Sequence, residues 1–185
     1  MAFIETIEYE QATGDLRKIY DELIGNRGKL ADVHKIQSLH PETIVSHINL
    51  YKDIMFGHSP LKRYQREMIG VVVSSVNQCE YCTRHHSEAL MHYWKDTEKI
   101  QSLIRQPDSA NLSEVDVLLC QFARDITTTP ELATQQKIDL LKVKGLTDRA
   151  ILDATLIIAY FNFVNRIALG LGLAINEEEI TGYNY

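Results

Sequence analysis

The sequence has few residues that break helices and no clear strand pattern. Its 185 residues include only 9 glycines and 4 prolines, and no segment alternates apolar and polar residues for more than a few positions. Helical patterns run through almost the whole chain instead. The sequence therefore predicts an all-α fold in a single domain of residues 1–185, in which residues 1–40 could form a loosely attached N-terminal helical arm.

Other absences narrow the class of protein. Three cysteines, an odd number, do not make a secreted disulfide framework, and a formal net charge of −6 with no lysine/arginine stripe argues against nucleic-acid binding. The N-terminus lacks the features of a signal peptide, and no run of about 18 apolar residues is present to span a bilayer. We therefore expect a cytoplasmic protein with neither nucleic acid nor membrane as a partner.

Proline, glycine and capping residues divide the chain into predicted helices. Their expected ranges are 13–24 (ending at Gly25), 41–56, 60–76, 78–94, 113–129, 130–144 and 147–173. The last of these is the longest apolar helix and is expected at the centre of the core. Because it is apolar on more faces than one helix buries inside a small monomer, it also predicts a homo-oligomer.

Most of the recognisable chemistry lies in one short stretch, "NQCEYCTRHHSEAL", at residues 77–90. On a helix, Cys79, Cys82 and His86 share one face within roughly 60° of arc. A Cys-x-x-Cys pair at a helix start also gains from the helix dipole, which favours the thiolate over the thiol. In a reducing compartment such a pair is more often catalytic or metal-binding than structural.

Glu67 is a further candidate, provided that the chain reverses near residue 77. On one straight helix it would lie ~18 Å from Cys79. In an antiparallel hairpin it falls opposite about residue 87, beside His86. A carboxylate, an imidazole and two thiols would then line one pocket. This set suits peroxide reduction, because a thiolate attacks the O–O bond and a second thiol condenses with the resulting sulfenic acid.

Structural interpretations of the same residues stay open. Cys79, Cys82 and His86 could bind zinc with a fourth ligand, which would make the chain a zinc-stabilised interaction module. Glu67 could be the salt-bridge partner of a lysine or arginine. His85 is interpreted as a solvated surface histidine, and Cys120 as a core cysteine. Four further histidines have no clustered partners in the sequence and receive no functional role: His40, His47, His58 and His92.

The spacing Glu67, eleven residues, Cys79-x-x-Cys82, three residues, His86 resembles the active-site signature of the alkylhydroperoxidase D / carboxymuconolactone decarboxylase superfamily. The strings "REMIGVVVSSVNQCEYC", "LSEVDVLLCQFARDITTTP" and "GLTDRAILDATLIIAYFNFVNRIALGLG" are similar to its peroxidase-related branch. The resemblance extends over most of the chain.

The resemblance implies a helical fold built round a hairpin, a homo-oligomer such as a trimer or hexamer, and an antioxidant thiol peroxidase that needs no metal or organic cofactor. Cys79 and Cys82 would be the redox pair, with Glu67 and His86 as the proton relay. A thiol reductant, either a protein or a small molecule, would reopen the disulfide. Characterised alkylhydroperoxidases carry histidine where this chain has Tyr81. A lyase acting on a small carboxylated lactone is the alternative, although decarboxylase members generally lack the cysteine pair.

Overall fold

The computed structural model describes residues 2–107, 110–180 and 182, and every regular element in these ranges is helical. The all-α prediction is therefore confirmed. The elements are η1 (Tyr9–Gln11), α1 (Gly14–Arg27), α2 (Asp32–Lys35), α3 (Pro41–Phe56), α4 (Arg63–Val76), α5 (Glu80–Trp94), α6 (Thr97–Arg105), α7 (Glu114–Thr128), η3 (Pro130–Leu132), α8 (Gln135–Val143), α9 (Asp148–Gly170) and α10 (Glu177–Ile180).

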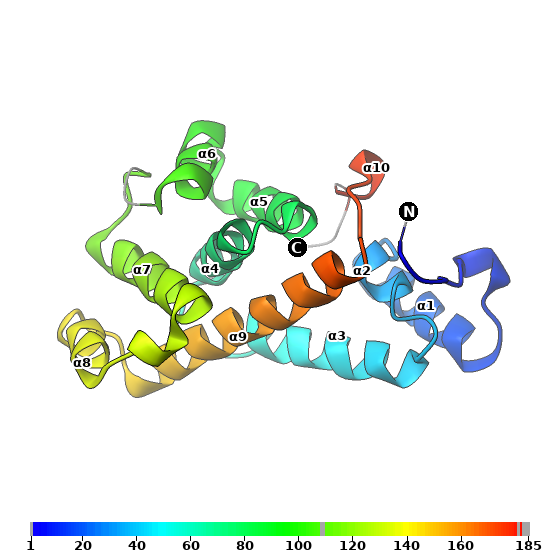
Figure 1. Ribbon diagram of the computed structural model, residues 1–185, viewed down its shortest axis with the longest axis horizontal. Helices are drawn as coiled ribbons and strands as arrows, with labels where there is room; N and C mark the ends of the chain where they lie inside the picture. Colours follow the sequence, from blue (N-terminus) through cyan, green and yellow to red (C-terminus); the bar gives the residue numbers. More distant parts are fainter. Residues whose placement is uncertain (1, 108–109, 181, 183–185) are drawn as a thin grey trace.

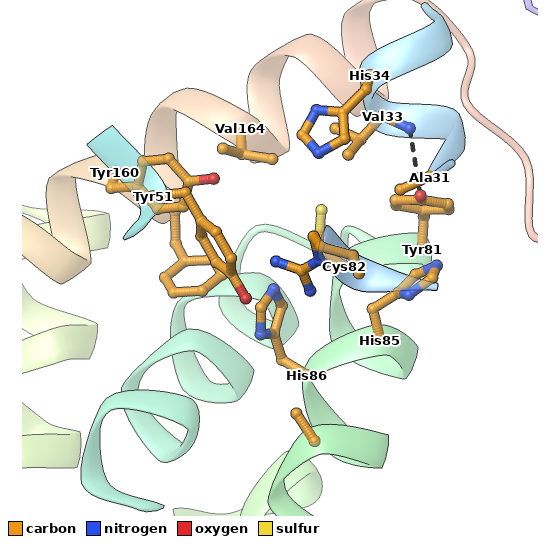
Figure 2. Close-up of a pocket in the computed structure, with 13 residues that line it drawn as sticks. Ala31, Val33, His34, Tyr51, Tyr81, Cys82, His85, His86, Tyr160 and Val164 are labelled. Atoms are coloured by element: carbon orange, nitrogen blue, oxygen red, sulfur yellow. Dashed lines mark hydrogen bonds between the residues drawn. The ribbon is translucent and has the colours of Figure 1, made fainter. Parts of the chain in front are cut away.

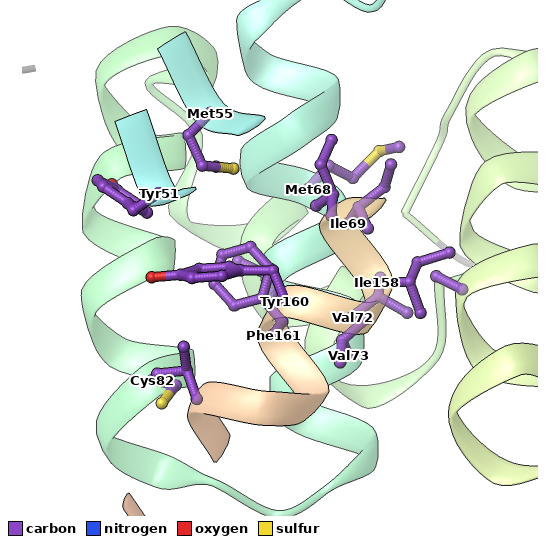
Figure 3. Close-up of a cluster of buried hydrophobic side chains, with 14 of the residues drawn as sticks. Tyr51, Met55, Met68, Ile69, Val72, Val73, Cys82, Ile158, Tyr160 and Phe161 are labelled. Carbon is purple, nitrogen blue, oxygen red and sulfur yellow. The ribbon is translucent and has the colours of Figure 1, made fainter. Parts of the chain in front are cut away.

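Helix α4 is the most enclosed element of the fold. Every residue from Gln65 to Ser74 is buried, because α4 packs against α5, α7 and α9 at once. Figure 3 shows Met68, Ile69 and Val72 of α4 close to apolar side chains of α9. The sequence placed the centre of the core at α9, which does contribute many buried residues but leaves one face exposed.

Helix α9 and helix α3 run alongside each other along the length of the molecule (Figure 1). By length and composition α9 could cross a membrane, but 56% of its most apolar stretch is buried inside the protein, as expected of a core helix. Its exposed apolar side chains include Leu152, Leu156 and Phe163.

The N-terminal residues share the main core. Leu16, Tyr20 and Leu23 of α1 are buried against it, and α1 packs on α3. The predicted end of this helix at Gly25 is wrong, because Gly25 lies within α1 and the chain leaves the helix at Gly28, with φ +80°. A glycine is tolerated inside a helix at a cost of about 1 kcal/mol, whereas a left-handed residue at the C-terminus favours glycine.

Two predicted helix starts also differ from the structure. Helix α4 begins at Arg63 rather than residue 60, because the Gln65 side chain accepts a hydrogen bond from the backbone N–H of Lys62 (2.9 Å) and caps the helix there. Helix α5 begins at Glu80, so Cys79 is its N-cap residue rather than part of the helix. The longer predicted helices at 41–56 and 113–129 match α3 and α7, with Ser113 capping α7 through the N–H of Asp116.

Candidate active site

The two cysteines lie at the turn between α4 and α5. Gln78 adopts the left-handed conformation (φ +57°), and the N–H of Cys79 returns to the carbonyl of Ser74 at 2.9 Å, so the chain reverses within three residues. Cys79 caps α5 and Cys82 lies in its first turn. Both thiols are free and buried. The turn therefore holds the pair at the positive end of the helix dipole.

Amide side chains of α9 fix this turn. Asn77 donates to Asn162 Oδ1 at 3.0 Å and to Asn165 Oδ1 at 2.9 Å, and Asn165 donates to Ser74 Oγ at 3.1 Å. Asn165 is fully buried. Buried amides need partners, so this set of hydrogen bonds fixes the position of the hairpin against α9. Sequence reasoning missed Asn165, although an asparagine within the apolar pattern of α9 was a usable signal.

The structure brings Glu67 and His86 together across the hairpin. His86 Nδ1 and Glu67 Oε2 are 2.8 Å apart, and Glu67 is 1% exposed. Its other oxygen accepts from Arg63 at 2.9 Å. A carboxylate only accepts hydrogen bonds, so His86 donates through Nδ1 and its Nε2 is left as the basic nitrogen. Glu67 thus has both proposed partners, an imidazole and an arginine.

The two thiols are coupled through a hydrogen bond. This bond lowers the pKa of Cys79, while burial opposes the shift. The same bond, together with burial, raises the pKa of Cys82 well above its ordinary value, against a lowering hydrogen bond from Asn165. When the pair loses one proton, the negative charge is therefore favoured on Cys79 and the remaining proton on Cys82.

A pocket opens onto Cys82 but not onto Cys79. Figure 2 shows the Cys82 sulfur between His86, the Tyr81–His85 pair and the tyrosines of α3 and α9. Glu67 lies behind His86 and does not line the pocket. The lining residues are Arg27, Ala31, Val33, His34, Tyr51, Tyr81, Cys82, His85, His86, Ala89, Tyr160, Phe161 and Val164.

Two histidines that received no site role belong to this pocket or its wall. His34 lines the pocket, and its Nδ1 is buried with no hydrogen-bond partner among the described residues. His47 bonds Gln37 and Tyr160, each at 2.8 Å, and its ring lies 5.3 Å from that of His34. The expectation that His47 has no partners is therefore wrong, because α2, α3 and α9 converge here from distant parts of the chain.

His85 is also not a solvated surface residue. Its side chain is 14% exposed, it lines the pocket, and its ring lies 4.4 Å from that of Tyr81. Its Nε2 is 3.5 Å from Glu179 Oε2. The other Glu179 oxygen accepts from Tyr81 (2.7 Å) and from the N–H of Asp32 (3.0 Å). Buried Glu179 of α10 thus links the cysteine-bearing helix to α2.

Two further expectations concerned Cys120 and a possible metal site. Cys120 is fully buried in the core, as expected. Within the described ranges, no group of three histidine, cysteine, aspartate or glutamate side chains is arranged to hold a metal ion.

Comparison with known proteins relates the α4–α5 hairpin to a known family. The carboxymuconolactone decarboxylase family model matches residues 46–125, which include the whole α4–α5 hairpin. No relative among the curated proteins matches at the sequence level. The family match supports a relation to the alkylhydroperoxidase D / carboxymuconolactone decarboxylase superfamily.

Solved structures share the fold of this chain. An uncharacterized peroxidase-related protein from Silicibacter sp. TM1040 is 26% identical, with TM-score 0.83, covering 96% of this chain and 91% of that chain. An alkylhydroperoxidase AhpD core protein, peroxidase-related, from Ralstonia eutropha JMP134 is 23% identical, with TM-score 0.88 and coverage of 97% and 94%. The debrominase Bmp8 shares the fold at 20% identity, with TM-score 0.77 and coverage of 95% and 96%. Two of these three structures are of peroxidase-related proteins, and both share the fold of this chain over nearly its whole length.

Proposed function

We propose that the protein is a thiol-dependent peroxidase that reduces hydroperoxides through Cys79 and Cys82. The observation that carries this proposal is the position of Cys82, whose thiol faces a pocket beside an imidazole held by a buried carboxylate. The similarity to two peroxidase-related structures supports the same chemistry. The four residues Glu67, Cys79, Cys82 and His86 are the proposed catalytic set.

Once His86 has taken one proton from the thiol pair, the remaining proton shifts between the two sulfurs. The Cys82 proton moves along the shared hydrogen bond to Cys79, which places the thiolate on the sulfur that faces the pocket. Cys82 then attacks one peroxide oxygen, the O–O bond breaks, and Cys82 becomes a sulfenic acid while the alkoxide leaves. Cys79 condenses with the sulfenic acid, forming the disulfide and releasing water. An external thiol reductant restores the pair by exchange.

His86 and Glu67 handle the protons. The Nε2 of His86 takes a proton from the thiol pair before attack and returns it to the leaving alkoxide. Glu67 holds the ring through Nδ1 and stabilises the imidazolium, while its other oxygen accepts a hydrogen bond from Arg63. The overall reaction converts one hydroperoxide and two thiols into one alcohol, one disulfide and water, so no other oxidant is needed.

Mass spectrometry of the intact protein tests the proposal. The reduced protein is treated with one equivalent of cumene hydroperoxide, and the products are digested without reduction. We expect loss of two hydrogens per chain, a linked Cys79–Cys82 peptide and one equivalent of alcohol. Unchanged protein with intact peroxide would reject the peroxidase.

Reductive dehalogenation of an aromatic ring is a second candidate, favoured by the pocket wall. Tyr51, Tyr81, Tyr160 and Phe161 surround Cys82, and the related debrominase structure has been solved with 2,3,4-tribromopyrrole. A dithiol could convert a carbon–bromine bond into a carbon–hydrogen bond, giving bromide, a proton and a disulfide. Bromide release from tribromopyrrole, measured beside peroxide consumption, separates the two reactions.

The lyase alternative makes a different demand. Acid–base chemistry on a carboxylated lactone by Glu67 and His86 consumes no thiol. Lactone turnover that survives alkylation of both cysteines would favour the lyase. Peroxide turnover that requires both cysteines favours the peroxidase.

A further inference from the structure

We propose that Arg27 and His34 form a subsite that binds a carboxylate on the substrate, so the preferred substrate is an aromatic hydroperoxide with an anionic group. This inference rests on the proposed peroxidase function for the reacting group only. The subsite itself is a binding site and is tested without turnover.

Arg27 brings a permanent positive charge to the pocket wall. It is the last residue of α1, and the left-handed Gly28 turns the chain immediately after it. Its guanidinium carbon lies 4.9 Å from the centre of the Tyr51 ring, which itself lines the pocket. A guanidinium presents several donors in a plane, which suits two-point binding of a carboxylate.

His34 supplies an unsatisfied polar atom next to this charge. Its side chain is 6% exposed and lines the same pocket, yet Nδ1 has no hydrogen-bond partner within the described ranges. Buried polar atoms are rarely left unpaired, so such an atom in a cavity indicates a ligand or water position. Burial lowers the pKa of His34 to about 3, and the neutral ring can therefore donate one hydrogen bond from this nitrogen at neutral pH.

The rest of the pocket fits a flat apolar body. Aromatic rings of Tyr51, Tyr160 and Phe161 form one side, and Val33, Ala89 and Val164 add apolar surface. Among the described residues that line the pocket, none is a carboxylate. A ligand with an aromatic ring between a carboxylate and a hydroperoxide could reach from Arg27 towards Cys82.

The subsite can be measured with unreactive ligands. The probes are 4-isopropylbenzoate and its neutral analogue 4-isopropylbenzamide, titrated calorimetrically into the reduced protein. We expect the benzoate to bind the wild type about tenfold more tightly than the amide, as one charge-assisted hydrogen-bonded contact provides. Arg27→Gln should remove this preference and Arg27→Lys should keep part of it. His34→Gln should weaken benzoate binding more than amide binding.

Arg17→Gln provides the matched control, because Arg17 also lies on α1 but pairs with Asp21 and Tyr9 away from the pocket. It should bind both ligands like the wild type. Equal affinities of the wild type for the two ligands would overturn the proposal. So would an equal loss of both ligands in Arg27→Gln, which would make Arg27 a wall residue only.

Kinetics separate this inference from the peroxidase proposal. Cumene hydroperoxide and its 4-carboxy derivative differ only in the charged group. We expect Arg27→Gln to raise KM for the carboxylated peroxide about tenfold while leaving KM for cumene hydroperoxide unchanged. Preferential benzoate binding without any peroxide consumption would reject the peroxidase and leave the subsite standing. Peroxide turnover without a preference for the charged peroxide would support the peroxidase and reject the subsite.

Discussion

Glu67 and His86 are 19 positions apart in the sequence, yet their side chains meet at 2.8 Å across the α4–α5 hairpin. The carboxylate is almost fully buried and also pairs with Arg63. One buried charge therefore serves two neighbours, a pocket imidazole and a peripheral arginine. The two contacts can be removed separately.

Glu67→Gln should slow peroxide reduction by roughly 10²–10⁴-fold, the range typical of acid–base groups. The amide keeps the shape of the side chain but cannot stabilise a protonated His86. Rates are measured from pH 6 to 8 on protein shown to be folded by circular dichroism. Arg63→Gln is the control, because it breaks the 2.9 Å ion pair and leaves the His86 contact in place. If both variants have lower melting temperatures but unchanged rates of peroxide reduction, Glu67 is a structural partner and not part of a relay.

The two cysteine variants should behave differently. Cys82→Ser removes the thiol that faces the pocket, so it should abolish peroxide consumption. Cys79→Ser should consume at most one equivalent and leave a sulfenic acid that dimedone traps, because no resolving thiol remains. Cys120→Ala changes a buried core residue. The folded fraction of this variant should reduce peroxide at the wild-type rate. Sustained turnover in either of the first two variants would contradict the dithiol mechanism.

Gly70→Ala should destabilise the fold by about 1–3 kcal/mol, the usual range for overpacking. A Cβ atom at this position would lie 2.6 Å from the ring of Phe161, which is fully buried. The ring also meets His86 edge-on, 4.4 Å between centres, so the rate should fall as well. Urea denaturation measures the stability change. Gly25→Ala, in open space on α1, should instead be neutral or stabilising by up to about 1 kcal/mol.

Stability should decline as the pH falls below about 6.5. Burial lowers the pKa of His34 to about 3 and that of His47 to about 4, from an ordinary value of 6.5. The unfolded chain therefore binds protons in this window that the folded chain does not, and the free energy of unfolding falls by up to about 1.4 kcal/mol per pH unit for each histidine. The stabilisation is fully present above pH 6.5 and is lost progressively towards pH 4.

Urea denaturation at pH 7, 6 and 5 checks this prediction. His34→Gln should make the decline shallower, because one of the two groups no longer titrates. His58→Gln, at an exposed position, should leave the slope unchanged. A slope identical in all three proteins would mean that His34 does not resist protonation.

Light scattering should give a mass of at least three chains, each of 21.2 kDa. Leu152, Leu156 and Phe163 are exposed by 43–53% on α9, and Leu50 of the neighbouring α3 is exposed by 45%. Such a run of apolar side chains on adjacent helices is typical of an interface. Leu156→Asp should lower the mass, whereas Val143→Asp on α8, which is 79% exposed, should not. A mass near 21 kDa for the wild type at micromolar concentration would rule out this oligomer.

The sequence predicted the local part of the site and missed the long-range part. Reversal near residue 77 placed Glu67 opposite about residue 87, within one position of its partner His86, because a tight hairpin fixes its own register. Arg27 could not be assigned in this way. The helix was expected to end at Gly25, and only its continuation to Gly28 brings Arg27 to the pocket.

His34 and Tyr160 were missed for a related reason. Neither lies in the active-site signature of Glu67, the two cysteines and His86, and their meeting depends on how α2, α3 and α9 pack, which helical periodicity does not encode. His85 was misjudged because its buried neighbour Glu179 lies 94 residues further along the chain. Helix ends were predicted better where a capping group was visible, as at Ser113, than where a glycine could be tolerated inside a helix.

The pocket is assembled from residues inside and outside the segment that matches the family model. The match to the family covers residues 46–125, which hold both thiols and the proposed relay, whereas Arg27, His34 and Tyr160 lie outside it. Substitutions at Arg27 and His34, which lie before the matched segment, can therefore change what enters the pocket without altering the residues of the α4–α5 hairpin. The substrate of such a protein can diverge in evolution while its chemistry stays the same. The same separation can be used in the laboratory. Chimaeras that exchange residues 1–40 between related proteins should exchange ligand preference and keep their thiol reactivity.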